Sequence, residues 1–243
     1  MLTEIILAFV QAATEFLPVS SSGHLALVSS FISSPNLFLF TVFHLASLVA
    51  VLIFTRKEVY SLVTFKPEAK KLWLYLIIAT IPAMIFGLLF NDKIEAAFSS
   101  LLFLGFAFIF TGIILFATKF TKVKSELNLK NSLFIGLCQC IALFPGVSRS
   151  GMTISSGMFS GLDKEKAAKF SFLLFIPVSL GAFILELKDF YINSAVIVSF
   201  FVCVIFSLLF LKALTLVIKK DKFWLFSIYC WVIGIITLIL YFR

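Results

Sequence analysis

Long apolar segments recur along the chain and constrain its fold more than any other feature. Hydrophobic residues make up 61% of the 243 residues and charged residues only 13%; ordinary soluble domains have about half and about a quarter. A helix that crosses a bilayer needs about 20 apolar residues. Segments of about this length lie at 38–54, 72–90, 100–118, 168–186, 195–217 and 224–242. The alternating strands of a membrane barrel are not seen. The sequence therefore predicts an all-α polytopic membrane protein with six transmembrane helices.

Two further apolar stretches are interrupted by polar turns. Residues 3–31 are broken at 18–23, and residues 132–160 are broken at 145–151. Each half is about 13–15 residues long, which is too short to cross a bilayer alone. We expect two re-entrant helical hairpins, each with its turn inside the membrane.

The two broken stretches resemble each other at an offset of 128 residues. Identical residues occur at four pairs of positions, namely Gln11 and Gln139, Ser20 and Ser148, Ser22 and Ser150, and Gly23 and Gly151. Each half of the chain reads as a hairpin followed by three spans, and a unit with three spans re-enters from the opposite side. We predict a single membrane domain over 1–243 that is an inverted repeat, with copies at 1–120 and 131–243.

The basic residues divide unequally between the two sides that this topology defines. Of the 20 lysines and arginines, fifteen fall in the loops of one side and three in the loops of the other. The rich side is cytoplasmic by the positive-inside rule, so both termini are expected outside. Because topology explains the net charge of +8, we predict contacts with membrane lipids and no binding of nucleic acid.

Ionisable side chains flank both polar turns, where burial in a membrane is costly and usually functional. Glu15 and His24 lie beside the first turn and Arg149 in the second. Hydroxyl groups accompany them at Ser20, Ser21, Ser22, Ser148, Ser150 and Thr153. If the turns meet, all these groups share one pocket. The plainer alternative is a Glu15–Arg149 ion pair that only holds the hairpins together.

The same turns suit an anionic ligand. The start of each second half-helix presents free backbone N–H groups and the positive end of the helix dipole. Arg149 can bind phosphate oxygens through two nitrogens. A serine beside His24 is a minimal pair for covalent phosphoryl chemistry, and Glu15 could orient the histidine, accept a proton or hold a metal ion. The pattern favours a phosphate or diphosphate headgroup held inside the membrane.

Two segments resemble the signature motifs of the undecaprenyl-diphosphate phosphatase (BacA/UppP) family. They are residues 14–25 and residues 145–153, the latter reading Pro-Gly-Val-Ser-Arg-Ser-Gly-Met-Thr; residues 44–47 and 170–174 resemble its secondary motifs. The resemblance covers nearly the whole chain. It implies an enzyme of the bacterial cytoplasmic membrane, folded as an inverted repeat, whose active site opens outward. Such an enzyme hydrolyses undecaprenyl (polyprenyl) diphosphate to the monophosphate and inorganic phosphate, which recycles the lipid carrier of cell-wall synthesis.

The resemblance also implies roles for individual residues. Residues that match family active-site positions are Glu15, Ser21, His24, Ser148, Arg149 and Thr153. Neighbouring candidates for binding the substrate are Gln11, Ser20, Ser22 and Ser150. We favour Ser21 as nucleophile with His24 as its base. A divalent cation, Mg²⁺ or Ca²⁺, held by Glu15 would offset charge on the diphosphate.

The first motif departs from the family pattern at Gln11. The family usually reads Glu-Gly-x-Thr-Glu where this chain has Gln-Ala-Ala-Thr-Glu over residues 11–15. Glutamine keeps the shape and hydrogen bonding of glutamate but loses its charge. Two alternatives to hydrolysis therefore stay open: a lipid-phosphate transporter or flippase, which shares the inverted repeat and the midplane anion site, and an inactive lipid-binding relative. A homodimer is also possible.

Overall fold

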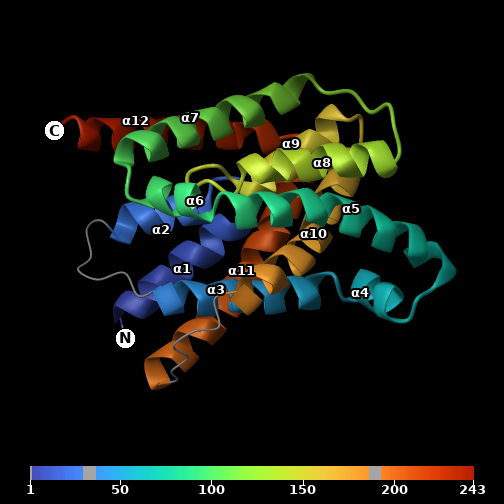
Figure 1. Cartoon of the computed structure of the whole chain (residues 1–243), viewed down its shortest axis with the longest axis horizontal. Helices are drawn as coiled ribbons and strands as arrows, with labels where there is room; N and C mark the ends of the chain where they lie inside the picture. The colour runs from blue at the N-terminus through green and yellow to red at the C-terminus, as the bar shows by residue number, and fades with distance from the viewer. Residues whose placement is uncertain (1, 30–36, 186–192) are drawn as a thin grey trace.

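Apolar helices make up the computed structural model, which describes residues 2–29, 37–185 and 193–243 (Figure 1). This part of the chain contains no strand, which confirms the all-α prediction. The helices are α1 (Leu2–Phe16), α2 (Ser21–Ser29), α3 (Leu37–Phe54), α4 (Arg56–Val63), α5 (Pro67–Leu89), α6 (Asn91–Phe98), α7 (Leu101–Ala117), α8 (Leu129–Ile141), α9 (Arg149–Phe159), α10 (Lys164–Leu185), α11 (Ser194–Lys219) and α12 (Phe226–Tyr241).

Four described helices are long and apolar enough to cross a membrane, and they coincide with four predicted spans. They cover Ala69–Leu89, Leu101–Phe120, Ser194–Lys219 and Phe223–Tyr241. A fifth span is formed if α3 and α4, which are bent by 85° at their junction, count as one. The remaining predicted span, 168–186, falls on α10 except for residue 186, which lies outside the described residues. The protein is therefore an integral membrane protein with four or five such helices.

Each interrupted apolar stretch forms two short helices joined by a tight turn. The first turn, residues 17–20, separates α1 from α2, and the second, residues 142–148, separates α8 from α9. Pro18 explains why α1 stops at Phe16, because a proline pushes the residue before it out of the helical conformation. Ser148 caps α9 by accepting a hydrogen bond from the backbone N–H of Gly151.

Each first half-helix packs along a long helix from the other half of the chain. Helix α1 lies against α11, and α8 lies against α5. Helices α7 and α12 lie side by side, as Figure 1 shows, and α3 contacts both α10 and α11. The core between them is formed by fully buried side chains such as Phe16, Phe43 and Leu174. Because α1 and α8 each pack on a helix from the other half of the chain, the two turns come together in the middle of the molecule.

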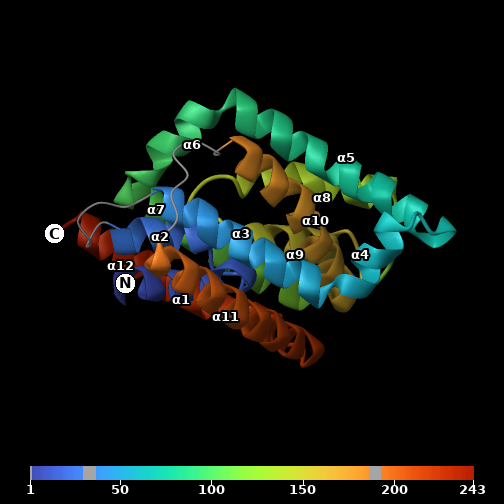
Figure 2. The same cartoon turned by 90° about the horizontal axis from the view of Figure 1, so that it is seen from below.

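The chain ends and the basic loops lie at opposite ends of the molecule. Figures 1 and 2 both place the N- and C-termini at the left end, and α4 with the start of α5 at the right end. Large apolar side chains are exposed along the long helices, among them Leu88, Phe106, Ile205 and Ile239. Such faces are typical of helices that contact lipid.

Candidate active site

The two turns are in direct contact, which fulfils the condition under which the polar groups of both turns share one site. The hydroxyl of Ser20 accepts hydrogen bonds from the backbone N–H of Gly146 at 3.1 Å and of Gly23 at 3.2 Å. A Cβ atom on Gly23 would lie 2.8 Å from the Cα of Gly146, so only glycine permits this approach. Thr111 of α7 fixes the second turn by donating to the Gly146 carbonyl and accepting from the Ser148 N–H, at 3.0 and 3.2 Å.

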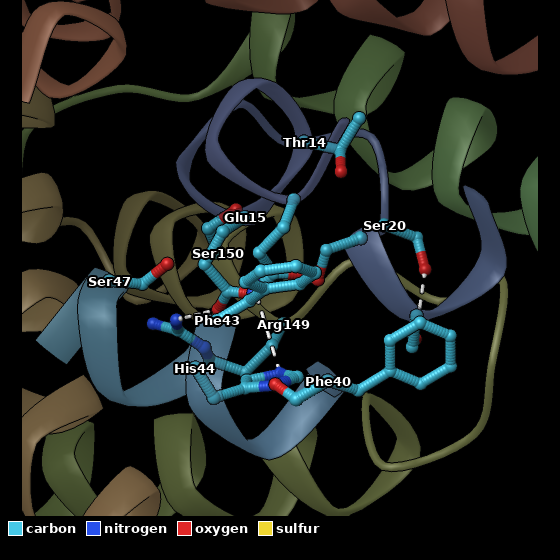
Figure 3. A network of polar contacts seen from close by, with 12 residues as sticks. Thr14, Glu15, Ser20, Phe40, Phe43, His44, Ser47, Arg149 and Ser150 are labelled. Carbon is cyan, nitrogen blue, oxygen red and sulfur yellow. Dashed lines mark hydrogen bonds and ion pairs between the residues drawn. The ribbon is translucent and has the colours of Figure 1, made fainter. Parts of the chain in front are cut away.

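The carboxylate of Glu15 lies within a network of polar side chains and receives donors on both oxygens (Figure 3). Arg149 donates to Oε1 at 2.7 Å. The Ser21 hydroxyl and the Gln11 amide donate to Oε2 at 2.6 and 3.0 Å. His44 of α3 places Nε2 at 3.7 Å from the same oxygen. The predicted proximity of Glu15, Ser21, Arg149 and Gln11 is therefore confirmed, and His44 joins them.

The guanidinium of Arg149 uses only part of its hydrogen-bonding capacity within the described residues. Its Cζ lies 4.1 Å from the centre of the Phe175 ring on α10, a cation–π contact. One terminal nitrogen is bound to Glu15, whereas the other, Nη1, is buried without a hydrogen-bond partner among the described residues. A buried donor without a partner is costly. An anionic ligand would satisfy it.

The remaining hydroxyl groups hold the turns and the start of α9. Ser148 Oγ lies 3.2 Å from Ser150 Oγ, and Ser150 lies 3.4 Å from the Leu17 carbonyl. Ser22 Oγ lies 3.4 Å from Ser20 Oγ. Thr153 donates to or accepts from Ser171 of α10 at 2.6 Å. All the predicted hydroxyl groups thus lie on the two hairpins around the contact, and their direct binding to a substrate stays a prediction.

His24 has different partners from those expected. Its Nδ1 lies 2.7 Å from the Ser20 carbonyl oxygen, and its Nε2 lies 2.8 Å from the hydroxyl of Tyr229 on α12. The His24 and Tyr229 rings stack with centroids 5.6 Å apart. Both ring nitrogens are engaged in this way, and Ser21 is paired with Glu15 instead.

One side chain of this site, Tyr229, was missed from the sequence. It lies inside a long apolar helix without a charge or a turn to single it out, and its partner His24 is 205 residues away along the chain. Ser171 lies within residues 170–174, which resemble a secondary motif, but its contact with Thr153 was not predicted.

The donor set around Glu15 does not fit a resident divalent cation. Such ions need several oxygen ligands, and no group of three or more His, Cys, Asp or Glu side chains suited to a metal occurs within the described ranges. The carboxylate is already surrounded by the N–H and O–H donors of Arg149, Gln11 and Ser21. The predicted dependence on Mg²⁺ or Ca²⁺ stays a prediction.

Fold and site together define an integral membrane protein with a buried cluster of charged and polar side chains where two helical hairpins meet. The model of the family described as bacitracin resistance protein BacA matches residues 4–236. The chain belongs to this family.

Curated relatives match the chain over nearly its whole length. An undecaprenyl-diphosphatase of Thermosipho africanus is 44% identical, over 97% of this chain and 98% of the relative. An undecaprenyl-diphosphatase of Elusimicrobium minutum is 43% identical, over 97% and 96%. A third protein of that name, from the archaeon Methanobrevibacter smithii, is 39% identical, over 96% and 95%.

Proposed function

We propose that the protein is a membrane phosphatase that hydrolyses undecaprenyl diphosphate to undecaprenyl phosphate and inorganic phosphate. The names of its relatives support this substrate. The observation that carries the proposal is the arrangement around Glu15. One of its oxygens accepts the hydroxyl of Ser21, and the other accepts Arg149, which keeps a free donor. A base, a nucleophile and a cation are therefore assembled around one point.

In the proposed reaction Ser21 is the nucleophile and Glu15 is its general base. The hydroxyl proton moves to Glu15 as Ser21 Oγ bonds to the terminal phosphorus, and the bond from that phosphorus to the bridging oxygen breaks. Undecaprenyl phosphate leaves. Water then attacks the phosphoserine as the Tyr229 hydroxyl turns its proton away from Nε2 of His24, and Nε2 takes up a proton from that water. The bond between phosphorus and Oγ breaks, Oγ recovers its proton from Glu15, His24 returns its proton to solvent, and inorganic phosphate is released.

Charge stabilisation comes from Arg149 and from the helix termini. Helices α2 and α9 begin at Ser21 and Arg149, next to the contact between the turns. Their N-termini carry the positive ends of the helix dipoles, which stabilise an anion. The free Nη1 of Arg149 would bind an oxygen of the transferred phosphoryl group, where negative charge is concentrated.

The proposed topology has six spans, with α10 as one of them, and two re-entrant hairpins in an inverted repeat of 1–120 and 131–243. The exchange of α1 onto α11 and of α8 onto α5 supports the repeat, because corresponding elements make corresponding contacts. The two termini lie at the end of the molecule opposite the basic segment around α4, which supports an outward position for them. An active site that opens outward from the bacterial cytoplasmic membrane, and a homodimer, stay predictions.

Gln11 does not favour an inactive relative. Its amide donates to Glu15 at 3.0 Å, so the carboxylate is held in place where an ionised glutamate at position 11 would repel it. The amide completes the arrangement around the base.

The test is phosphate release from undecaprenyl diphosphate by purified protein in detergent. We expect Glu15→Gln and Arg149→Ala each to lower kcat at least about 100-fold, the range of a lost general base or charge stabiliser. The matched controls are Glu95→Gln and Arg56→Ala, which lie on α6 and α4 and should keep parental rates. Mg²⁺, Ca²⁺ and a chelator are compared in parallel to test the predicted cation.

Mass spectrometry of acid-quenched enzyme identifies the nucleophile. A phosphorylated peptide over residues 20–23 that disappears in Ser21→Ala supports the mechanism. A folded parent protein that binds the lipid and releases no phosphate would favour the transporter or binding alternatives and overturn the proposal.

A further inference from the structure

We propose that Tyr229 is a positioning residue that holds the imidazole of His24 in the orientation and tautomer that the proposed phosphatase reaction requires. This inference rests on the proposed function. Its first support is geometric: the Tyr229 hydroxyl lies 2.8 Å from His24 Nε2, and the two rings are stacked with an interplanar angle of 15°. The contact joins α2 of the first hairpin to α12, the last helix of the chain.

The other nitrogen of His24 is fixed from the turn. Its Nδ1 lies 2.7 Å from the carbonyl oxygen of Ser20, which can only accept a hydrogen bond, so Nδ1 carries a hydrogen. Ser20 has a φ of 69°, in the left-handed region that few non-glycine residues adopt. Its side chain is held by the N–H groups of Gly23 and Gly146. In the neutral imidazole, Nε2 is therefore the acceptor, and Tyr229 is its donor.

A tyrosine hydroxyl suits this position because it can both donate and accept. It donates to Nε2 while His24 is neutral, and it turns to accept from Nε2–H once the histidine has taken up a proton. A carboxylate in its place would favour the charged imidazole, and an ammonium group would favour the neutral one. The hydroxyl is therefore a partner that His24 keeps through both protonation states of one catalytic cycle.

The other described contacts of the His24 ring do not offer a hydrogen-bond donor to Nε2. His24 is 8% exposed. Among the described residues, its ring also contacts Phe108 of α7, edge-on with centroids 5.1 Å apart. Phe108 holds the ring laterally and offers no hydrogen bond. Tyr229 is 43% exposed, so the buried imidazole is paired with a residue that reaches the surface of the described helices.

The substitution Tyr229→Phe removes the hydroxyl and keeps the stacked ring. In the full-length protein in detergent, we expect kcat for undecaprenyl diphosphate to fall about 10-fold or more, a smaller loss than the roughly 100-fold or more expected when a general base itself is removed, with KM changed less than 2-fold. Tyr241→Phe on the same helix is the matched control and should keep the parental kcat. A kcat within 2-fold of parent in Tyr229→Phe would overturn the proposal.

A double-mutant cycle separates positioning from a general structural effect. If Tyr229 acts through His24, adding Tyr229→Phe to His24→Gln lowers the residual kcat less than 2-fold, because the partner is already absent. A further 10-fold loss in the His24→Gln background would show that Tyr229 acts on something else and would contradict the proposal.

Nitrogen NMR supplies a readout that does not depend on turnover. The chain contains two histidines, so ¹⁵N-histidine labelling gives few signals, and His44→Gln assigns them. The parent should show His24 in the Nδ1–H tautomer with a hydrogen-bonded Nε2, and Tyr229→Phe should shift the Nε2 resonance or mix the tautomers. Unchanged resonances overturn the proposal. An inactive parent with the expected resonances would refute the proposed function and leave the positioning contact standing.

Discussion

The two hairpins have the same construction but carry opposite chemistry. In both, a serine before the second half-helix accepts a hydrogen bond from a glycine N–H three residues later, Ser20 from Gly23 and Ser148 from Gly151. At the offset of 128 residues, Ser21 of the first hairpin corresponds to Arg149 of the second. The two hairpins, each capped by a serine in the same way, thus place a nucleophile candidate and a cation at corresponding positions of the offset.

The charged groups of the first hairpin are replaced by apolar ones in the second. Glu15 corresponds to Leu143 and His24 to Met152. Because the turns face each other, the carboxylate of one hairpin meets the guanidinium of the other at 2.7 Å. A pair of identical hairpins would bring two like charges together, so the difference between the two hairpins is what allows the ion pair to form.

The largest effect is expected from giving the first hairpin the residue of the second. Glu15→Leu should abolish phosphate release and lower the free energy of unfolding by about 3–5 kcal/mol, because Arg149 is left buried without its partner. Thermal unfolding in detergent measures the second effect.

The double variant Glu15→Leu with Arg149→Leu tests whether the pair is only structural. We expect much of the lost stability to return while activity stays absent. Activity in either variant above a few per cent of parent would contradict the role of Glu15 as the base.

The aligned glycines should differ in their tolerance of alanine. A Cβ on Gly23 meets the backbone of Gly146 at 2.8 Å, whereas a Cβ on Gly151 meets the Ser148 side chain at 3.0 Å. The Gly23 contacts are shorter and include the backbone of the facing turn, so Gly23→Ala should cost about 1–3 kcal/mol of stability and separate the turns, and Gly151→Ala should cost less. Equal losses in thermal unfolding would show that the hairpins tolerate bulk alike.

The aligned glutamines should respond differently to a negative charge. Gln11 donates to Glu15, whereas the nearest partner of the Gln139 amide is the Ala79 carbonyl at 3.5 Å. Gln11→Glu should lower kcat about 10-fold when cations are chelated, because two adjacent carboxylates repel and one takes up a proton. Added Mg²⁺ or Ca²⁺ should restore it, since paired carboxylates are suitable ligands.

Gln139→Glu is the control for position and should show no rescue by cations. A rise in kcat of Gln11→Glu under chelation would instead show that the amide limits the parent enzyme.

The smallest effects are expected at the aligned serines Ser22 and Ser150. Ser150 is 1% exposed and lies near Ser148 and the Leu17 carbonyl, while Ser22 has a single weak contact with Ser20. Alanine should lower kcat less than about 5-fold at either position, with the larger loss at Ser150, in keeping with one hydrogen bond of about 1 kcal/mol. The opposite order would place Ser22 closer to the substrate.

The sequence predicted what local patterns determine. The length of the apolar segments predicted four spans that the structure contains, and proline and glycine residues indicated both turns at which the helices break. The pairing of Glu15 with Arg149 followed from placing two costly charges in facing turns. The partner of Ser21 did not follow, because His24 is its neighbour on α2 while Glu15 arrives from α1 across the turn. From the sequence, Gln11 indicated only the loss of a negative charge. The structure shows that its amide donates a hydrogen bond to Glu15.

The contact of α1 with α11 has a consequence for how the chain is made. Ribosomes add about 5–20 residues per second, so about 10–40 s pass between the synthesis of residue 16 and that of residue 219. During this interval the first hairpin, with Glu15 and His24, has not met the helices that complete its packing. Complete assembly therefore waits for the last quarter of the chain, and a protein truncated after α10 would expose the face of α1 that packs on α11 to the quality-control proteases of the membrane.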